Sequence, residues 1–186
     1  MNAAIAFEKV GEKPYARVFA RVGAYIIDCV ILFVGLIVWQ AALYVVNPLI
    51  AIFRSGQQPT GTQLQLWVFA TATIPFLLCF ALMLRSARQA TLGMRLLKLK
   101  VIDVDGGCIG FGQTLLRSSV MLIPFELNHT VIFHLSPRDV PPSTTFWLGL
   151  IGVWTVIAIY IASILLTTRR QSVHDLVAGT AVERIS

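Results

Sequence analysis

The chain has 186 residues, of which 56% are hydrophobic and only 13% charged, and its formal net charge is +6. With a mean hydropathy of +0.77, this composition excludes an ordinary soluble domain and predicts an integral membrane protein that forms one membrane domain over residues 1–186. Its basic residues are divided among the flanks of the apolar runs rather than collected on one soluble face. We therefore expect no nucleic acid as a partner.

Three runs, residues 22–46, 67–84 and 146–166, are apolar and long enough to cross a bilayer. At about 1.5 Å per residue they reach about 37, 27 and 31 Å, against a hydrocarbon core of about 30 Å. A fourth run, residues 118–135, is interrupted by Pro124 and several polar residues. The expected fold class is an all-α membrane protein, a four-transmembrane-helix bundle.

The basic residues decide between three spans and four. Of the 15 Lys and Arg residues, only Arg54 and Arg138 lie in the first and third connections between the runs. Four spans place all the others on the cytoplasmic side, whereas three would leave Arg169 and Arg170 outside. Both termini are therefore expected to be cytoplasmic, beside the anionic lipid of the inner leaflet.

The connection between the second and third runs has the pattern of a β-hairpin. Residues 97–104 are rich in apolar and β-branched side chains, and Asp105-Gly106-Gly107 offers a tight turn. We expect a small cytoplasmic hairpin here. Asp103 and Asp105 resemble the start of a calcium loop, but the later oxygen ligands are missing, so no metal site is expected.

Asp28 lies inside the first apolar run, where a carboxylate costs on the order of 3 kcal/mol or more unless it faces protein, water or a cation. Arg21 lies seven residues earlier, on nearly the same helix face and about 10 Å away along the axis. The simplest expectation is an intramembrane pair between Arg21 and Asp28.

A second intramembrane carboxylate, Glu126, is expected at about 13 Å from Arg117 along the third span, a depth similar to that of Asp28. Two carboxylates close together in a low dielectric cannot both stay charged without a cation. Asp28 and Glu126 could thus form a site that exchanges a proton for a monovalent cation. His129, one turn from Glu126, could take part because it changes charge near neutral pH.

After the fourth run, Ser172, Asp175 and Gly179 have the spacing of a short capped helix. Asp175 has two interpretations at this point. It is either a capping carboxylate or the partner of a nearby cytoplasmic arginine.

Four segments of the chain, in order, resemble the RDD family of bacterial membrane proteins. The resemblance implies a multi-pass protein of the bacterial inner (plasma) membrane, in which Arg21, Asp28 and Asp175 are the arginine and two aspartates that name the family. It suggests transport, in some members linked to sodium/proton exchange. The polar residues near Glu126 depart from the usual family pattern. The segments are Arg21-Val-Gly-Ala-Tyr-Ile-Ile-Asp28, Ala90-Thr-Leu-Gly93-Met-Arg95-Leu-Leu, Val101-Ile-Asp-Val-Asp-Gly106-Gly and Arg170-Gln-Ser-Val-His174-Asp175-Leu-Val-Ala-Gly179-Thr.

Two functions are therefore open: transport or monovalent cation/proton exchange through intramembrane carboxylates, and a non-catalytic membrane scaffold in which Arg and Asp form a structural pair. The chain shows no nucleophile with its base and no phosphate loop, so we expect no enzyme, catalytic residue or cofactor. Four spans are few for a solute path, and a homo-oligomer or a membrane-protein partner is expected. The candidate charge sites are Arg21, Asp28, Glu126, His129, Asp175 and Arg95.

Overall fold

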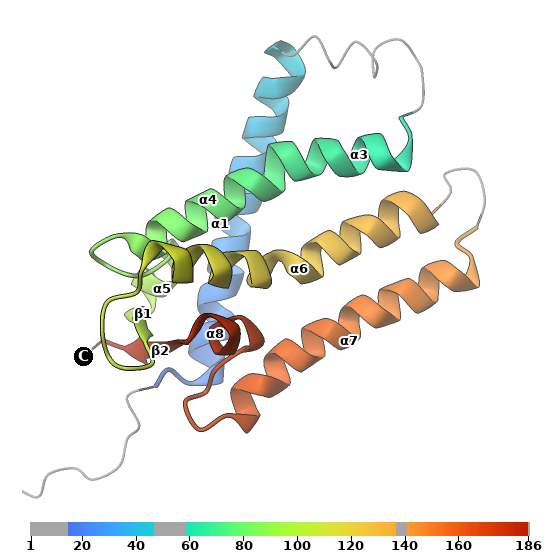
Figure 1. Ribbon diagram of the computed structural model, residues 1–186. Helices are drawn as coiled ribbons and strands as arrows, with labels where there is room; N and C mark the ends of the chain where they lie inside the picture. The colour runs from blue at the N-terminus through green and yellow to red at the C-terminus, as the bar shows by residue number, and fades with distance from the viewer. Residues whose placement is uncertain (1–14, 47–58, 137–140, 186) are drawn as a thin grey trace, which may run out of the picture.

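A computed structural model describes residues 15–46, 59–136 and 141–185. Lys9, Lys13, Arg54 and Arg138, which entered the charge count above, lie outside these residues. The described chain is mostly helical, with one small pair of strands (Figure 1). Its elements are α1 (Val18–Val46), α3 (Gly61–Val68), the π-helical segment η2 (Phe69–Thr73), α4 (Ile74–Arg85), α5 (Leu92–Leu96), β1 (Leu99–Asp103), α6 (Phe111–Leu135), α7 (Thr144–Leu166), α8 (Val173–Ala178) and β2 (Thr180–Arg184).

Three helical stretches are long and apolar enough to cross a membrane: Val18–Leu43, Gly61–Arg85 and Thr144–Leu166. The prediction of apolar membrane-spanning helices at these places is confirmed. The helix α6 has 25 residues and packs against α4 and α7. Its polar residues make it less apolar than the other three helical stretches. The count of four spans and the cytoplasmic position of both termini stay predictions.

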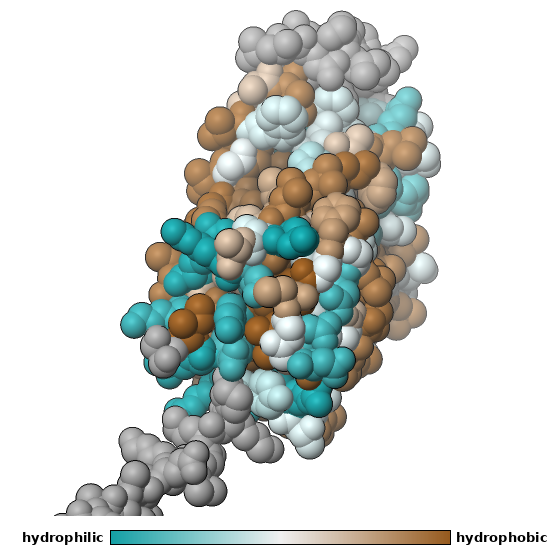
Figure 2. Space-filling view, turned by 60° about the vertical axis from the view of Figure 1, so that its left-hand side comes forward, coloured by the Kyte–Doolittle hydropathy of each residue, from teal (hydrophilic) through white to brown (hydrophobic). Residues whose placement is uncertain are grey.

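The helices α4, α6 and α7 lie side by side, and α1 crosses their direction (Figure 1). Hydrophilic side chains gather on the end of the molecule that carries α5, β1 and β2, whereas the flanks of the helices are hydrophobic (Figure 2). Large apolar side chains such as Phe33, Val38 and Leu165 are more than 60% exposed. Lipid, rather than water, is the solvent that suits such a surface.

Two prolines lie inside the helical stretches, and each frees a carbonyl oxygen that a neighbouring helix then binds. Pro75 cannot donate to Thr71, whose carbonyl accepts a bond from Trp39 Nε1 of α1 at 2.9 Å. Pro124 cannot donate to Val120, whose carbonyl accepts the hydroxyl of Tyr160 of α7 at 2.8 Å. In lipid such carbonyls must find protein donors, so the prolines help to join α1 to η2 and α6 to α7.

The strand predicted in residues 97–104 is present as β1, but the prediction of a local hairpin is wrong. After the turn at Gly106, which has a φ of +88°, the chain goes directly into α6. β1 pairs instead with β2 at the other end of the chain, antiparallel, with Val101 opposite Val182. Both valines are fully buried in an apolar cluster with Leu84 of α4. β1 pairs with the distant strand because β2 supplies this apolar partner face. Residues 108–110 are too short a segment to supply it.

The pairing of β1 with β2 can be tested by cross-linking. Lys100 lies opposite Glu183, and side chains at opposed positions of an antiparallel pair are about 5 Å apart. In a chain whose native cysteines are replaced by alanine, Lys100→Cys with Glu183→Cys should form a disulfide on oxidation, seen as a mobility shift on non-reducing gels. Asp105→Cys with Glu183→Cys is the matched control and should stay reduced. Equal cross-linking of both pairs would contradict this strand register.

Candidate functional site

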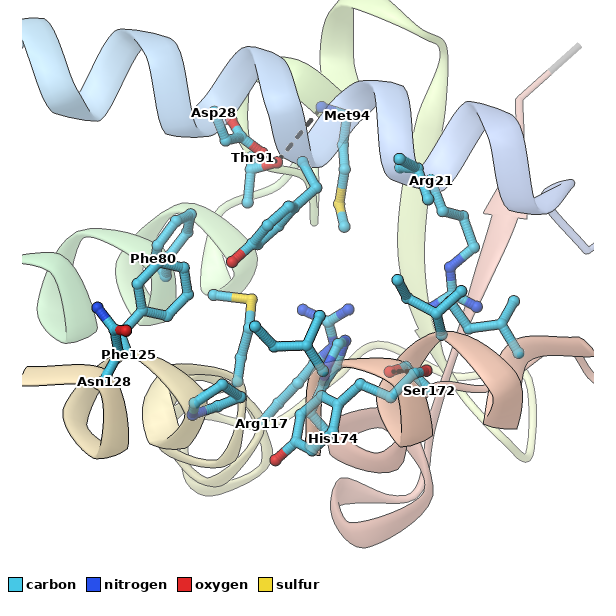
Figure 3. A pocket seen from close by; sticks show the side chains of 18 of the residues that line it. Arg21, Asp28, Phe80, Thr91, Met94, Arg117, Phe125, Asn128, Ser172 and His174 are labelled. Carbon is cyan, nitrogen blue, oxygen red and sulfur yellow. Dashed lines mark hydrogen bonds between the residues drawn. The ribbon is translucent and has the colours of Figure 1, made fainter. Parts of the chain in front are cut away.

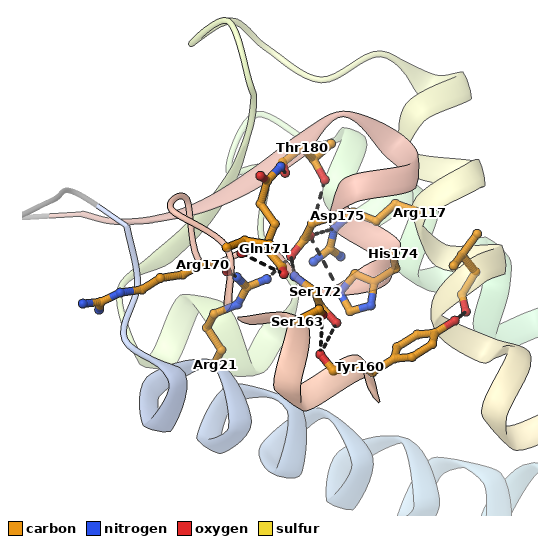
Figure 4. A network of polar contacts seen from close by, with 12 residues as sticks. Arg21, Arg117, Tyr160, Ser163, Arg170, Gln171, Ser172, His174, Asp175 and Thr180 are labelled. Carbon is orange, nitrogen blue, oxygen red and sulfur yellow. Dashed lines mark hydrogen bonds and ion pairs between the residues drawn. The ribbon is translucent and has the colours of Figure 1, made fainter. Parts of the chain in front are cut away.

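The carboxylate of Asp175 is the centre of a buried charge cluster in which three helices meet (Figure 4). Asp175 is fully buried at the third position of α8. Arg117 of α6 donates from Nε to Oδ1 at 2.8 Å, and Arg21 of α1 donates from Nη2 to Oδ2. The Ser172 amide and the Thr180 hydroxyl donate as well, at 3.0 and 3.3 Å. We call Arg21, Arg117 and Asp175 the charge cluster.

The charge cluster fastens the C-terminal segment to the helices. Arg21 also donates to the carbonyl of Arg170, just before α8. Gln171 donates from Nε2 to the carbonyl of Thr180 at 2.7 Å, which closes the loop around α8. Gly179 ends α8 with a φ of +63°, a conformation that favours glycine. Both expectations for Asp175 are confirmed, because it caps α8 and pairs with two arginines.

Electrostatics favour an ionised Asp175 in the charge cluster and a neutral His174 beside it, whose Nε2 lies 3.7 Å from Asp175 Oδ1. Burial alone would raise the pKa of the Asp175 carboxyl, but Arg117 and Arg21 outweigh it and hold the pKa well below its usual range. Burial is also the main reason that the pKa of His174 falls from 6.5 to about 3; Asp175 opposes the change, and the two arginines add to it. Because arginine side chains stay protonated in proteins, the cluster holds two positive charges and one negative charge at neutral pH.

Asp28 does not pair with Arg21, and that expectation is corrected. Among the described residues its partners lie between the end of α4 and the start of α6: Thr91 donates its hydroxyl to Oδ2 at 2.5 Å, and Gly93 donates its amide to Oδ1 at 2.7 Å. Gly93 is required because a Cβ there would lie 2.0 Å from the carbonyl of Ala24. Asp28 thus anchors α5 on α1, while Arg21 turns to α8, an element that no helical spacing within α1 could reveal.

Glu126 lies in a second polar group, formed between α6 and the helical stretch of residues 61–85. Thr73 donates its hydroxyl to Oε1, Gln65 donates from Nε2 to Oε2 at 2.9 Å, and His129 Nδ1 lies 3.3 Å from Oε1. The predicted neighbourhood of Glu126 and His129 is therefore present. Thr73 belongs to η2, whose wider turn shifts the following residues relative to an α-helix.

Asp28 and Glu126 line different cavities, so the structure gives no support to a cation shared between them. A cavity of about 340 Å³ beside η2 contains Glu126 and Thr73 in its wall. A larger cavity of about 460 Å³, the central cavity, contains Asp28, Arg21, Arg117 and His174 (Figure 3). It lies between α1 on one side and α6 and α7 on the other, with α8 at its base.

The remaining candidate, Arg95, has a local structural role. It donates from Nε to the carbonyl of Ala90 at 3.0 Å and from Nη2 to Ser86 Oγ at 3.3 Å. These bonds hold the turn between α4 and α5. Arg95 is not among the residues that line either cavity.

Arg117 is the main residue that sequence reasoning missed, since it was counted only as a flanking basic residue. The start of α6 was placed seven residues too late, at residue 118 instead of Phe111. A signal was present: the Gln113 side chain accepts the Gly110 amide at 2.9 Å, the spacing of a capping box without a hydroxyl residue at its start. With that start, Arg117 falls two turns inside the helix, where a charge needs a partner. Gln65, Thr73 and Thr91 carried no such signal.

The fold and the charge cluster together define a helical membrane-type protein. Its C-terminal segment is held against its helices by buried ion pairs between side chains. The model of the RDD family matches residues 15–179. This match covers most of the chain, and the protein belongs to the RDD family. No curated protein and no solved structure matches it.

Replacement of Asp175 should be the most damaging single change in the charge cluster. Asp175→Asn keeps the shape but leaves Arg21 and Arg117 buried without their counter-charge, which should cost about 3–5 kcal/mol. The matched control is Glu183→Gln, whose pair with Lys100 is partly exposed and should contribute about 1 kcal/mol or less. Thermal unfolding of the purified variants in detergent measures both. Comparable losses for the two variants would refute a structural role for the cluster.

The neutral state of His174 predicts a loss of stability on mild acidification. Its pKa is lower in the folded chain than the 6.5 of an unfolded one, so the unfolded state takes up the proton first as the pH falls. Below pH 6.5 the folding equilibrium constant should drop up to about tenfold per pH unit. Between about pH 6.5 and 5, above the range in which Asp175 titrates in the unfolded chain, His174→Gln should flatten this slope. The check is a series of denaturation curves for both proteins, and parallel slopes would contradict it.

Proposed function

We propose that this protein exchanges a monovalent cation for a proton across the membrane, and that Glu126 is the group that binds them in turn. The observation that carries the proposal is the environment of Glu126, a carboxylate beside a hydroxyl, a carboxamide and an imidazole in the wall of a cavity. An intramembrane carboxylate in such a setting is costly and is a mark of ion or proton pathways.

The position of Glu126 along α6 suits this role. It is the sixteenth residue of a 25-residue helix, about 22 Å from the helix start at 1.5 Å per residue. A group at that depth lies well away from the end of the molecule where hydrophilic side chains gather. Exchange requires access to the binding group from each side in turn, and a site between the two helix ends is compatible with that requirement.

The ligand chemistry also fits a small cation. Carboxylate, hydroxyl and amide oxygens are the ligands that hard cations prefer. Gln65 Oε1 is buried and, among the described residues, has no hydrogen-bond partner. A buried acceptor beside a carboxylate is completed either by a cation or by a proton on the acid. The same oxygens thus serve both ions in the proposed exchange.

A membrane scaffold is the second candidate, and the charge cluster is the observation that favours it. Asp175 accepts bonds from four donors, and such a satisfied group has no capacity left for a transported ion. Two of the residues that name the family, Arg21 and Asp175, would then hold the fold for a homo-oligomer or another membrane protein to assemble on. Under the scaffold proposal, the partner is a second copy of this chain or another membrane protein.

Ion flux in sealed liposomes that contain the purified protein distinguishes the two functions. Under the exchange proposal, a sodium or potassium gradient drives a pH change in wild-type vesicles. Glu126→Gln should abolish it with little loss of folded protein, because the amide keeps the shape and loses the exchangeable charge.

Thr73→Val should weaken the cation dependence of the flux, since it removes the hydroxyl that faces Glu126 and keeps the side-chain shape. Thr155→Val is the matched control, because among the described residues the Thr155 hydroxyl bonds only to the carbonyl of Ile151 in its own helix. Wild-type vesicles without any cation-dependent pH change would end the exchange proposal and leave the scaffold.

A further inference from the structure

The base of the central cavity has an excess of positive charge. Arg21 and Arg117 face a single carboxylate, Asp175, and all three side chains are more than 90% buried. Arg117 uses Nε for Asp175, whereas its Nη1 is buried and has no hydrogen-bond partner among the described residues. A guanidinium with an unused donor in the wall of a cavity is an incomplete anion site, because buried donors are almost always paired.

The mouth of the same cavity is apolar and faces outward. Trp154 is 66% exposed, Ile161 43%, Phe125 40% and Tyr25 37%, and all four line the cavity. They belong to α7, α6 and α1, the helices whose outer surfaces suit lipid. Figure 3 shows the aromatic and aliphatic side chains of the wall between the helices and the guanidinium of Arg117 near the base. A ligand that enters here meets hydrocarbon before it meets charge.

The depth of the charged base matches the level of a lipid head group. Arg21 is the fourth residue of α1 and Arg117 the seventh of α6, which places them about 5 and 9 Å from the helix starts. Both starts lie toward the end of the molecule that carries α5, β1 and β2 (Figure 1), where hydrophilic side chains gather (Figure 2). Polar head groups lie at such a boundary, and acyl chains extend from it along the helices.

Asp28 also lines the cavity and carries the opposite sign. Its two oxygens are already engaged by the Thr91 hydroxyl and the Gly93 amide, so they offer no strong site for a cationic group. Figure 3 shows Asp28 and Thr91 across the cavity from Arg117 and His174. The unpaired donor, and with it the attraction for a ligand, is at the arginine side.

We propose that the central cavity binds one anionic phospholipid, with its phosphate at Arg117 and an acyl chain in the apolar channel between α1 and α7. Arginine suits phosphate because its planar group donates two parallel hydrogen bonds. The apolar mouth selects a lipid over a free anion. This site is separate from Glu126, and it stands whether or not the protein exchanges cations.

Thermal unfolding of the full-length protein in detergent, titrated with lipid, tests the proposal. A ligand that binds only the folded state raises the unfolding temperature in a saturable way. Dioleoyl phosphatidylglycerol should bind about tenfold more tightly, or better, than dioleoyl phosphatidylcholine, which has the same chains and no net charge. Equal stabilisation by the two lipids would overturn the proposal. Equal stabilisation by inorganic phosphate alone would overturn the lipid assignment and indicate a free-anion site.

A pair of variants on α7 locates the binding. Ile161→Trp fills the cavity mouth and leaves every charge in place, so it should weaken phosphatidylglycerol binding about tenfold or more. Ile159→Trp is the matched control: Ile159 is 54% exposed and does not line the cavity, so this variant should bind like wild type. Unchanged binding by Ile161→Trp would show that the lipid lies elsewhere. The lipid comparison on the wild type decides the proposal even if Ile161→Trp does not fold.

Discussion

The burial of Asp175 between two arginines is the constraint on which the rest of this structure depends. A carboxylate and two guanidinium groups are removed from water together, and each would be costly alone. Arg21 comes from the first long helix, Arg117 from α6 and Asp175 from the last short helix. The observed arrangement of these three elements places both guanidinium groups against the one carboxylate. The same arrangement brings β2 next to β1 and places α8 beneath the central cavity.

The two carboxylates of the helical region have different kinds of partners, and this separates their roles. Asp28 is held by a hydroxyl and a backbone amide at the start of α5, which is a structural anchor between neighbouring segments. In the described part of the chain, the partners of the Glu126 carboxylate are all side chains, those of Thr73, Gln65 and His129. Side-chain partners can turn away or change protonation, whereas a backbone amide in a packed helix cannot. Glu126 is therefore the better candidate for a group that binds and releases an ion.

Much of the architecture was predictable because membrane helices are encoded locally. Apolar runs of about 20 residues identified three helices, and the spacing of Ser172, Asp175 and Gly179 identified the capped helix α8. The helix starts were less accurate, since the polar first turns of α3 and α6 resemble loops in composition. Strand β1 was also visible locally, through its apolar and β-branched residues. The position of its partner strand was not visible, because antiparallel pairing between residues 77 to 85 positions apart leaves no local pattern.

The sequence by itself determined that the chain is an apolar helical protein of the RDD type and that Asp28 and Glu126 needed partners. The reason is the high cost of a charge in an apolar run, which marks such residues wherever they occur. Tertiary structure alone decided which partners they have. Arg21 shares a helix face with Asp28 yet bonds to Asp175, 154 residues away, because the packing of α8 against α6 brings that carboxylate within reach. Helical spacing fixes the direction in which a side chain points. The residue that it meets depends on how distant segments of the chain pack.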